Sequence, residues 1–248
     1  MPSTSEVGHA KNVANFADII TYCTAYGATY NPSKANLQLP NLNTLLSTAQ
    51  TEITNVATAK NAFDMVTATR QSVFEPLKPL ATKILNALSV TDATEQTIAD
   101  AKTLNNKLQG RRANTTPKNP TPENGNGGTP QNTTASVSRQ SYDTLTENFS
   151  ALIDLVSAVP SYTPNETELT IASLTNYLQE LQTANTNVIT QEVAYSNARI
   201  SRNNVLYTKD TGLVDTAQDI KNYVKSIFGA TSAQYKQMSG IKFTNRTD

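Results

Sequence analysis

Two stretches of the chain resemble each other, and this internal similarity constrains the fold more than any other feature of the sequence. When Tyr30 is aligned with Tyr162 and both stretches run on without a gap, about fourteen of roughly 45 positions are identical. The best-matched run is QTEITNV (50–56) against QTANTNV (182–188). Because similar sequences adopt similar structures, a fold proposed for one copy has to suit the other as well.

Residues 111–137 separate the two copies and differ from both in composition. This segment, RRANTTPKNPTPENGNGGTPQNTTASV, holds mainly Pro, Gly, Asn and Thr and almost no apolar side chains. Such a composition buries too little apolar surface to offset the entropy lost on folding. We therefore predict a first helical repeat over 1–110, a flexible linker over 111–137 and a second helical repeat over 138–248.

The apolar side chains within each repeat follow a helical period. In the first repeat they recur at helical spacing, at Leu42, Leu45, Leu46, Ala49, Ile53, Val56, Phe63 and Val66. Neither Pro nor Gly interrupts 41–75 or 165–211. Each stretch therefore predicts one helix of about 35–40 residues, far longer than the usual length of about 11–12 residues.

Shorter helices are predicted around each long one, in the same order in both repeats. They cover about 9–26, 79–90 and 93–108 in the first repeat, and about 140–158, 213–228 and 232–239 in the second. Asp92 with Glu95 has the spacing of a capping box for the helix over 93–108. The fold class predicted is all-α: an elongated antiparallel helical bundle built from two duplicated units of three or four helices. Two separate small bundles on a tether are the alternative.

Composition excludes several classes of function. The chain has 248 residues with 20 basic and 20 acidic side chains, so no polyanion-binding surface is expected and nucleic acid is not a predicted partner. One Cys and one His exclude a disulfide framework and paired-His or multi-Cys metal sites. We predict no metal, no cofactor and no membrane span, since no run approaches the roughly 18 apolar residues that a span needs.

Three sequence features suggest catalysis but have simpler structural explanations. Cys23 lies on the apolar face of the first helix and is expected to be a small core residue. His9, fourteen residues earlier, is expected to be solvated near the terminus. Asp210-Thr211-Gly212 matches the triplet of aspartic proteases, which need two such carboxylates, whereas here a helix-ending turn is expected.

Arg70 and Arg202 are the candidate ligand-binding residues. They occupy equivalent positions near the ends of the two long helices, each seven residues after an aromatic residue of the apolar stripe. A guanidinium at such a place is costly unless it is paired. Two interpretations follow: the arginines bind an anion across a two-fold cavity, or each pairs with helix-end carbonyls or a nearby carboxylate.

The second repeat resembles a group of uncharacterised bacterial helical-bundle proteins. The strings that carry the resemblance are YSNARISRNNVLY (195–207) and GLVDTAQDIKNYVKSIFGATSAQYKQMSGIKF (212–243). The resemblance implies a bacterial source, but no activity and no functional residue.

The function predicted is a non-enzymatic structural or protein-interaction bundle, with a protein partner or a homo-oligomer. The long apolar stripes and the lack of a catalytic grouping favour it. A ligand-binding or sensory bundle with an anion site between the repeats is one alternative, a membrane-acting pore-forming protein is another, and an enzyme is least favoured. No secretion signal is visible in the first twenty residues, which predicts the cytoplasm.

Overall fold

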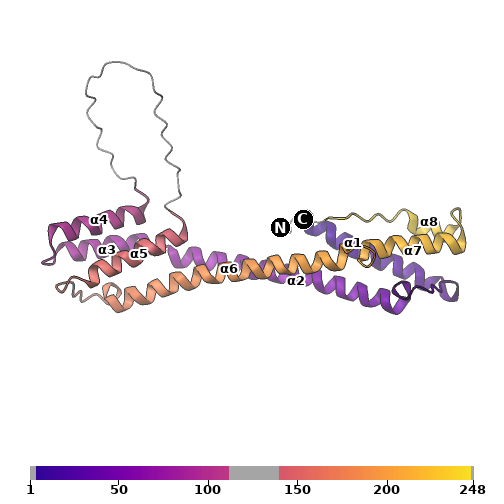
Figure 1. The fold of residues 1–248 in the computed structure, drawn as a ribbon, viewed down its shortest axis with the longest axis horizontal. Coiled ribbons are helices and arrows are strands. Elements are labelled where there is room, and N and C mark those ends of the chain that lie inside the picture. The colour runs from indigo at the N-terminus through magenta and orange to yellow at the C-terminus, as the bar shows by residue number, and fades with distance from the viewer. Residues whose placement is uncertain (1–3, 112–139, 247–248) are drawn as a thin grey trace, which may run out of the picture. The chain divides into compact units, whose positions relative to one another are not determined.

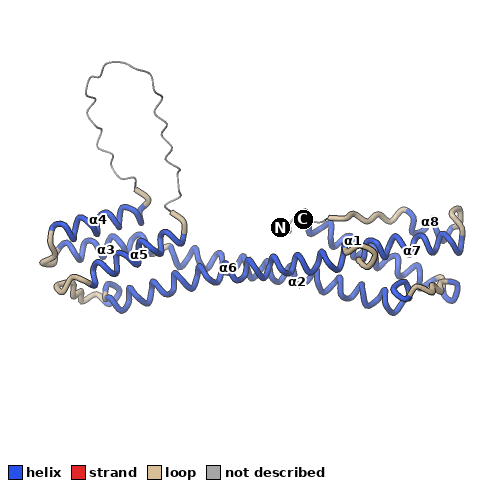
Figure 2. Tube along the Cα trace, viewed as in Figure 1, coloured by secondary structure: helices blue, strands red, loops and turns tan. Residues whose placement is uncertain are grey.

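The protein is all-α in the part of the chain that the structure describes. The computed structural model describes residues 4–111 and 140–246, and every regular element in these ranges is helical (Figure 1, Figure 2). The α-helices there are α1 (Thr4–Ala25), α2 (Leu39–Phe74), α3 (Leu77–Ser89), α4 (Glu95–Gln109), α5 (Tyr142–Ser157), α6 (Ile171–Tyr207), α7 (Leu213–Phe228) and α8 (Ala233–Ser239). The predicted all-α class is confirmed. The predicted linker, 111–137, lies outside the described residues except for Arg111.

The two long helices match the predicted lengths. α2 has 36 residues and α6 has 37. A short 3₁₀ turn precedes each of them, η2 (Ala35–Leu37) before α2 and η3 (Thr167–Leu169) before α6. One buried tyrosine fixes each turn: Tyr30 Oη donates to the Leu37 carbonyl at 2.7 Å, and Tyr162 Oη donates to the Leu169 carbonyl at 3.1 Å.

The chain forms two compact units, and both long helices pass from one unit to the other. Unit 1 comprises Met1–Met65 and Thr190–Asp248, and unit 2 comprises Val66–Ile189. Unit 1 therefore contains α1, the start of α2, the end of α6, α7 and α8. Unit 2 contains the end of α2, α3, α4, α5 and the start of α6. Each unit combines one part of each predicted repeat, and the duplication itself stays a prediction.

The core of unit 1 forms where α1 meets helices from the other half of the chain. Phe16, Ile19 and Cys23 of α1 are fully buried, and their spacing places them on one face of the helix. They belong to the same apolar cluster as Leu206 of α6 and Ile220 of α7. Because these residues lie about 200 positions apart in the chain, unit 1 exists only when both halves contribute to it.

Unit 2 has a core of the same construction. Phe149 and Leu152 of α5 are fully buried and cluster with Ile84 of α3 and Leu108 of α4. Phe74, the last residue of α2, joins them. α5 therefore takes in unit 2 the place that α1 takes in unit 1.

The helix ends follow capping rules, with one correction to the prediction. The cap of α4 is Thr94, whose hydroxyl accepts from the Thr97 N–H, so the capping box predicted at Asp92 is wrong. Ser232 caps α8 by accepting from the Tyr235 N–H at 3.1 Å. Gly229, with φ of 92°, ends α7 in a conformation that residues with a Cβ rarely adopt.

Candidate functional site

Arg202 is the largest fully buried side chain of the described residues. It lies in α6 within unit 1, with a relative exposure of 0%. Its Nε and Nη2 atoms donate to the Asn203 Oδ1 atom at 3.1 and 2.8 Å. A buried guanidinium needs such partners to offset the loss of its hydration. Arg202 is therefore built into the core, where a side-chain amide oxygen is a hydrogen-bond partner of its guanidinium.

Arg70 lies in α2 within unit 2 and is only half-buried. Its guanidinium carbon stands 4.1 Å from the centre of the Tyr142 ring, which is a cation–π contact between the two halves of the chain. Phe74 packs against the same ring, edge to face, at 4.7 Å. The buried Arg70 Nε has no hydrogen-bond partner among the described residues.

The two candidate arginines thus lie in different compact units, and each has its own surroundings. The contacts of Arg70 are mainly aromatic, whereas those of Arg202 are polar. Within unit 1 and within unit 2, only one of the two arginines is present. Anion binding by either arginine stays a prediction, and neither unit by itself holds the pair.

His9 is buried, which corrects the expectation that it is solvated. Its relative exposure is 0%, and its Nδ1 atom lies 2.5 Å from the Tyr207 hydroxyl. Asn12, one turn later in α1, donates to the same hydroxyl at 3.2 Å. This contact could not be predicted from the sequence, because His9 and Tyr207 lie 198 positions apart and only the fold brings them together.

The C-terminal segment after α8 is fixed to unit 1 by side-chain bonds to its backbone. Asn12 donates to the Thr244 carbonyl at 2.7 Å and accepts from the Thr244 N–H at 3.1 Å. Asn15 donates to the Lys242 carbonyl at 2.7 Å. Lys221 donates to the Ile241 carbonyl, and burial lowers the pKa of its amine below the usual value. The segment is therefore held in an extended conformation against α1 and α7.

Cys23 is a core residue, as expected. It is fully buried, and burial raises the pKa of its thiol to about 12. A nucleophilic cysteine needs a lowered pKa and access to substrate, and Cys23 has neither.

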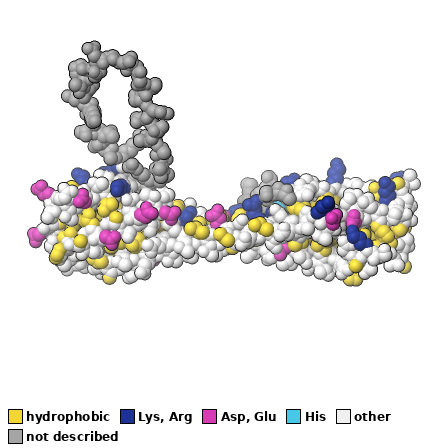
Figure 3. Space-filling view, in the orientation of Figure 1, with side chains coloured by type: hydrophobic (Ala, Val, Ile, Leu, Met, Phe, Trp, Pro, Cys, Tyr) yellow, Lys and Arg dark blue, Asp and Glu magenta, His cyan; other side chains and the backbone are white. Residues whose placement is uncertain are grey.

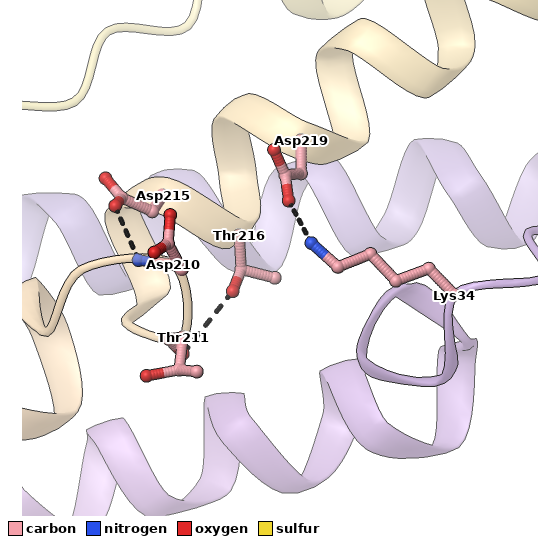
Figure 4. A network of polar contacts seen from close by, with 6 residues as sticks. All are labelled: Lys34, Asp210, Thr211, Asp215, Thr216 and Asp219. Carbon is pink, nitrogen blue, oxygen red and sulfur yellow. Dashed lines mark hydrogen bonds and ion pairs between the residues drawn. The ribbon is translucent and has the colours of Figure 1, made fainter.

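The Asp210-Thr211-Gly212 triplet forms a turn between α6 and α7, as predicted (Figure 4). Asp210 has a positive φ of 65°, and its N–H donates to the Asp215 carboxylate at 2.9 Å. The Gly212 N–H donates to the Thr208 carbonyl at 2.7 Å, which closes the turn. Asp210 therefore has a structural role in this turn.

A cavity of about 540 Å³ opens in unit 2 between α3 and the loop that leads to α6. Ala87, Val90 and Tyr162 supply apolar lining, while Lys83 and Glu168 pair across it at 2.8 Å. Together with Glu166, the charged lining residues give one positive and two negative charges. A small cation or a neutral molecule therefore suits this cavity better than an anion does.

A face of α6 in unit 1 exposes large apolar side chains. Val193 and Ile200 are 54% and 55% exposed and lie seven residues apart, which places them on one face of the helix. Tyr195 points to another side, where it stacks on Phe63 of α2 at 6.3 Å and 17°. Figure 3 shows hydrophobic side chains at the surface over the long helices. We call the Val193–Ile200 side the outer face of α6.

Two features are absent from the described residues, a cluster of metal-ligand side chains and a helix able to span a membrane. In 4–111 and 140–246, no three or more His, Cys, Asp or Glu side chains come together as metal ligands would. In the same ranges, no helix has the length and apolar character required to cross a membrane.

Comparisons with known proteins add no further assignment. No protein-family model matches the sequence, and no curated protein and no solved structure matches it. The resemblance to uncharacterised bacterial proteins stays an expectation.

Proposed function

We propose that this protein is a non-enzymatic helical protein that acts by binding another protein through the outer face of α6. The observation that carries the proposal is the pair of half-exposed apolar side chains, Val193 and Ile200, on one face of a long helix. A spacing of seven residues is the repeat by which helices pack along one another. A second helix laid along this face would remove both side chains from water.

The surroundings of this face support a helical partner. Glu192 is an exposed polar neighbour of Val193, and Ser196 and Asn197, also exposed, lie between Val193 and Ile200 on the same face, so a partner helix would meet apolar and polar side chains in turn. Single exposed apolar residues are common on protein surfaces, whereas aligned ones mark sites of association. The partner is another protein or a second copy of this chain.

Site-directed photo-crosslinking in the producing cell tests the proposal. A photoreactive residue at position 193 should give an adduct with a partner, whereas the same residue at Thr48, an exposed polar position of unit 1, should not. Val193→Ser with Ile200→Ser should weaken association at least tenfold in light scattering or a binding assay. Val90→Ser is the matched control because Val90 is 85% exposed but lies in unit 2. A strict monomer that gives no adduct specific to position 193 would contradict the proposal.

The cavity of unit 2 supports a second candidate function, the binding of a small cationic or neutral molecule. Its volume of about 540 Å³ is in the range of small-molecule sites, and Glu166 and Glu168 outnumber Lys83 in its lining. A thermal-shift screen of small primary amines, with carboxylates as the opposite-charge set, tests it. Stabilisation by amines that is lost in Glu166→Gln/Glu168→Gln supports it, and equal shifts from both sets contradict it.

A further inference from the structure

Each unit contains an ion pair that joins the two halves of the chain. In unit 1, Lys34 Nζ lies 2.6 Å from Asp219 Oδ2, and Figure 4 shows the lysine reaching from the turn before α2 to α7. In unit 2, Lys83 Nζ lies 2.8 Å from Glu168 Oε1. Both pairs connect the turn before a long helix with the third helix of the other half.

The two ion pairs lie in corresponding regions of the two units. Asp219 directly precedes Ile220 and Lys83 directly precedes Ile84, and both isoleucines are fully buried. On the other side, Lys34 is the residue before η2, and Glu168 lies within η3. Each unit therefore has an ion pair between the turn and the third helix, although Lys34 aligns with Glu166, and Glu168 lies two residues further along its turn.

The polarity of the contact is reversed between the units. In unit 1 the turn carries the base and the third helix carries the acid. In unit 2 the turn carries the acid, at Glu168, and the third helix carries the base, at Lys83. α3 contains no acidic side chain, so its charge near η3 is wholly positive.

This reversal determines which halves can pair favourably. If the first half paired with the first half of a second copy of this chain, Lys34 would meet Lys83 of the copy. If the second half paired with the second half of another copy, Glu168 would meet Asp219 of that copy. Either contact brings like charges together, whereas pairing of the first half with the second half brings opposite charges together in both units.

We propose that the reversed ion pairs make assembly selective, so that the first half of the chain recognises the second half and rejects a second copy of itself. Specificity of this kind depends on the repulsion in the wrong complex as much as on the attraction in the right one. The residues are more than a third exposed, so the effect per pair is modest, about two- to fivefold in the partition between partners. This inference is independent of the proposed function, because it concerns contacts within units 1 and 2 only.

Refolding of full-length variants tests the inference. Lys34→Glu should repel Asp219 within the chain and attract Lys83 of a second copy. The fraction of chains in oligomers after refolding at high protein concentration, measured by light scattering coupled to gel filtration, should rise about two- to fivefold. Lys34→Glu/Asp219→Lys/Lys83→Glu/Glu168→Lys, which reverses all four charges and so restores repulsion between like halves, should return it to the wild-type value, and high salt should abolish the difference.

Lys60→Glu is the matched control. It makes the same change in charge but breaks a pair within one helix, since Lys60 contacts Asp64 four residues later in α2. Thermal melting of every variant identifies effects that come from lost stability alone. The inference is overturned if Lys34→Glu forms no more oligomer than Lys60→Glu, or if reversal of all four charges fails to restore the wild-type distribution.

Discussion

Units 1 and 2 are built from equivalent segments, yet the ends of their cores are closed differently. In unit 1, Tyr30 meets Tyr223 edge to face at 5.4 Å, and Tyr26 meets Phe228 at 5.2 Å. In unit 2 the position that corresponds to Tyr223 is Ala87, and an open cavity lies beside it. The same arrangement of helices therefore tolerates different packing at its end. In both units a buried tyrosine, Tyr30 or Tyr162, still hydrogen-bonds to the turn before the long helix.

The units also differ in the segment that packs on α1 in unit 1 and on α5 in unit 2. Unit 2 uses α4, a full helix of 15 residues, against α5. Unit 1 has only the seven-residue α8, and the extended segment after it is bonded to α1 by Asn12 and Asn15. A shorter helix is thus compensated by side-chain amides that bond to an extended backbone.

The largest effect is expected from equivalent core positions, which test whether the units really correspond. Phe16→Ala in unit 1 and Phe149→Ala in unit 2 each remove a fully buried ring. Each should lower the free energy of unfolding by about 3–5 kcal/mol in urea titrations. A loss below about 1 kcal/mol in either variant would show that its unit lacks the core described.

The two arginines should differ, although their sequence positions correspond. Arg202→Ala removes a fully buried, hydrogen-bonded guanidinium and should cost about 3 kcal/mol of stability. Arg70→Ala removes a half-buried cation–π contact with Tyr142 and should cost about 1 kcal/mol. Equal losses in chemical denaturation would mean that the environments of the two residues are alike, contrary to the structure.

Substitutions at the corresponding positions Tyr223 and Ala87 test whether the ends of the two units are packed differently. Tyr223→Ala removes the ring packed on Tyr30 and should cost about 1–2 kcal/mol. Ala87→Tyr places a ring beside the cavity of unit 2 and should leave stability unchanged or raise it by up to about 1 kcal/mol. Strong destabilisation by Ala87→Tyr would show that no space is available there.

The smallest effect concerns alkaline pH and Cys23, whose counterpart in unit 2 is the buried Val156. The pKa of the Cys23 thiol is raised from 9.0 to about 12, so above pH 9 the unfolded chain loses this proton while the folded chain keeps it. Stability must therefore fall as pH rises from 9 to 12, and by pH 10 this one group accounts for roughly 1 kcal/mol. Cys23→Val should remove that fall in denaturation curves between pH 8 and 10, whereas an unchanged slope would show that the thiol is not buried.

Much of the fold follows from local sequence, because helix period and capping depend on neighbouring residues. The long helices, the turn at Asp210 and the burial of Cys23 were predictable in this way. At α4 the cap is Thr94 rather than the predicted Asp92, which lies two residues earlier.

The division into units was not predictable from periodicity, which describes one helix at a time. The predicted apolar stripe of α2 continues through Phe63 and Val66, yet the structure buries no side chain between Val56 and Phe74. The burial of His9 depends on Tyr207, 198 residues away, so only the fold reveals it.

The most direct test of the central claim, that each compact unit is built from both halves of the chain, is cleavage between the halves. A protease site inserted between residues 120 and 121 allows the folded full-length protein to be cut once. Gel filtration in native buffer should then elute both fragments together with unchanged helicity, and separate them only in denaturant. Fragments that part in native buffer while each keeps its helices would contradict the account.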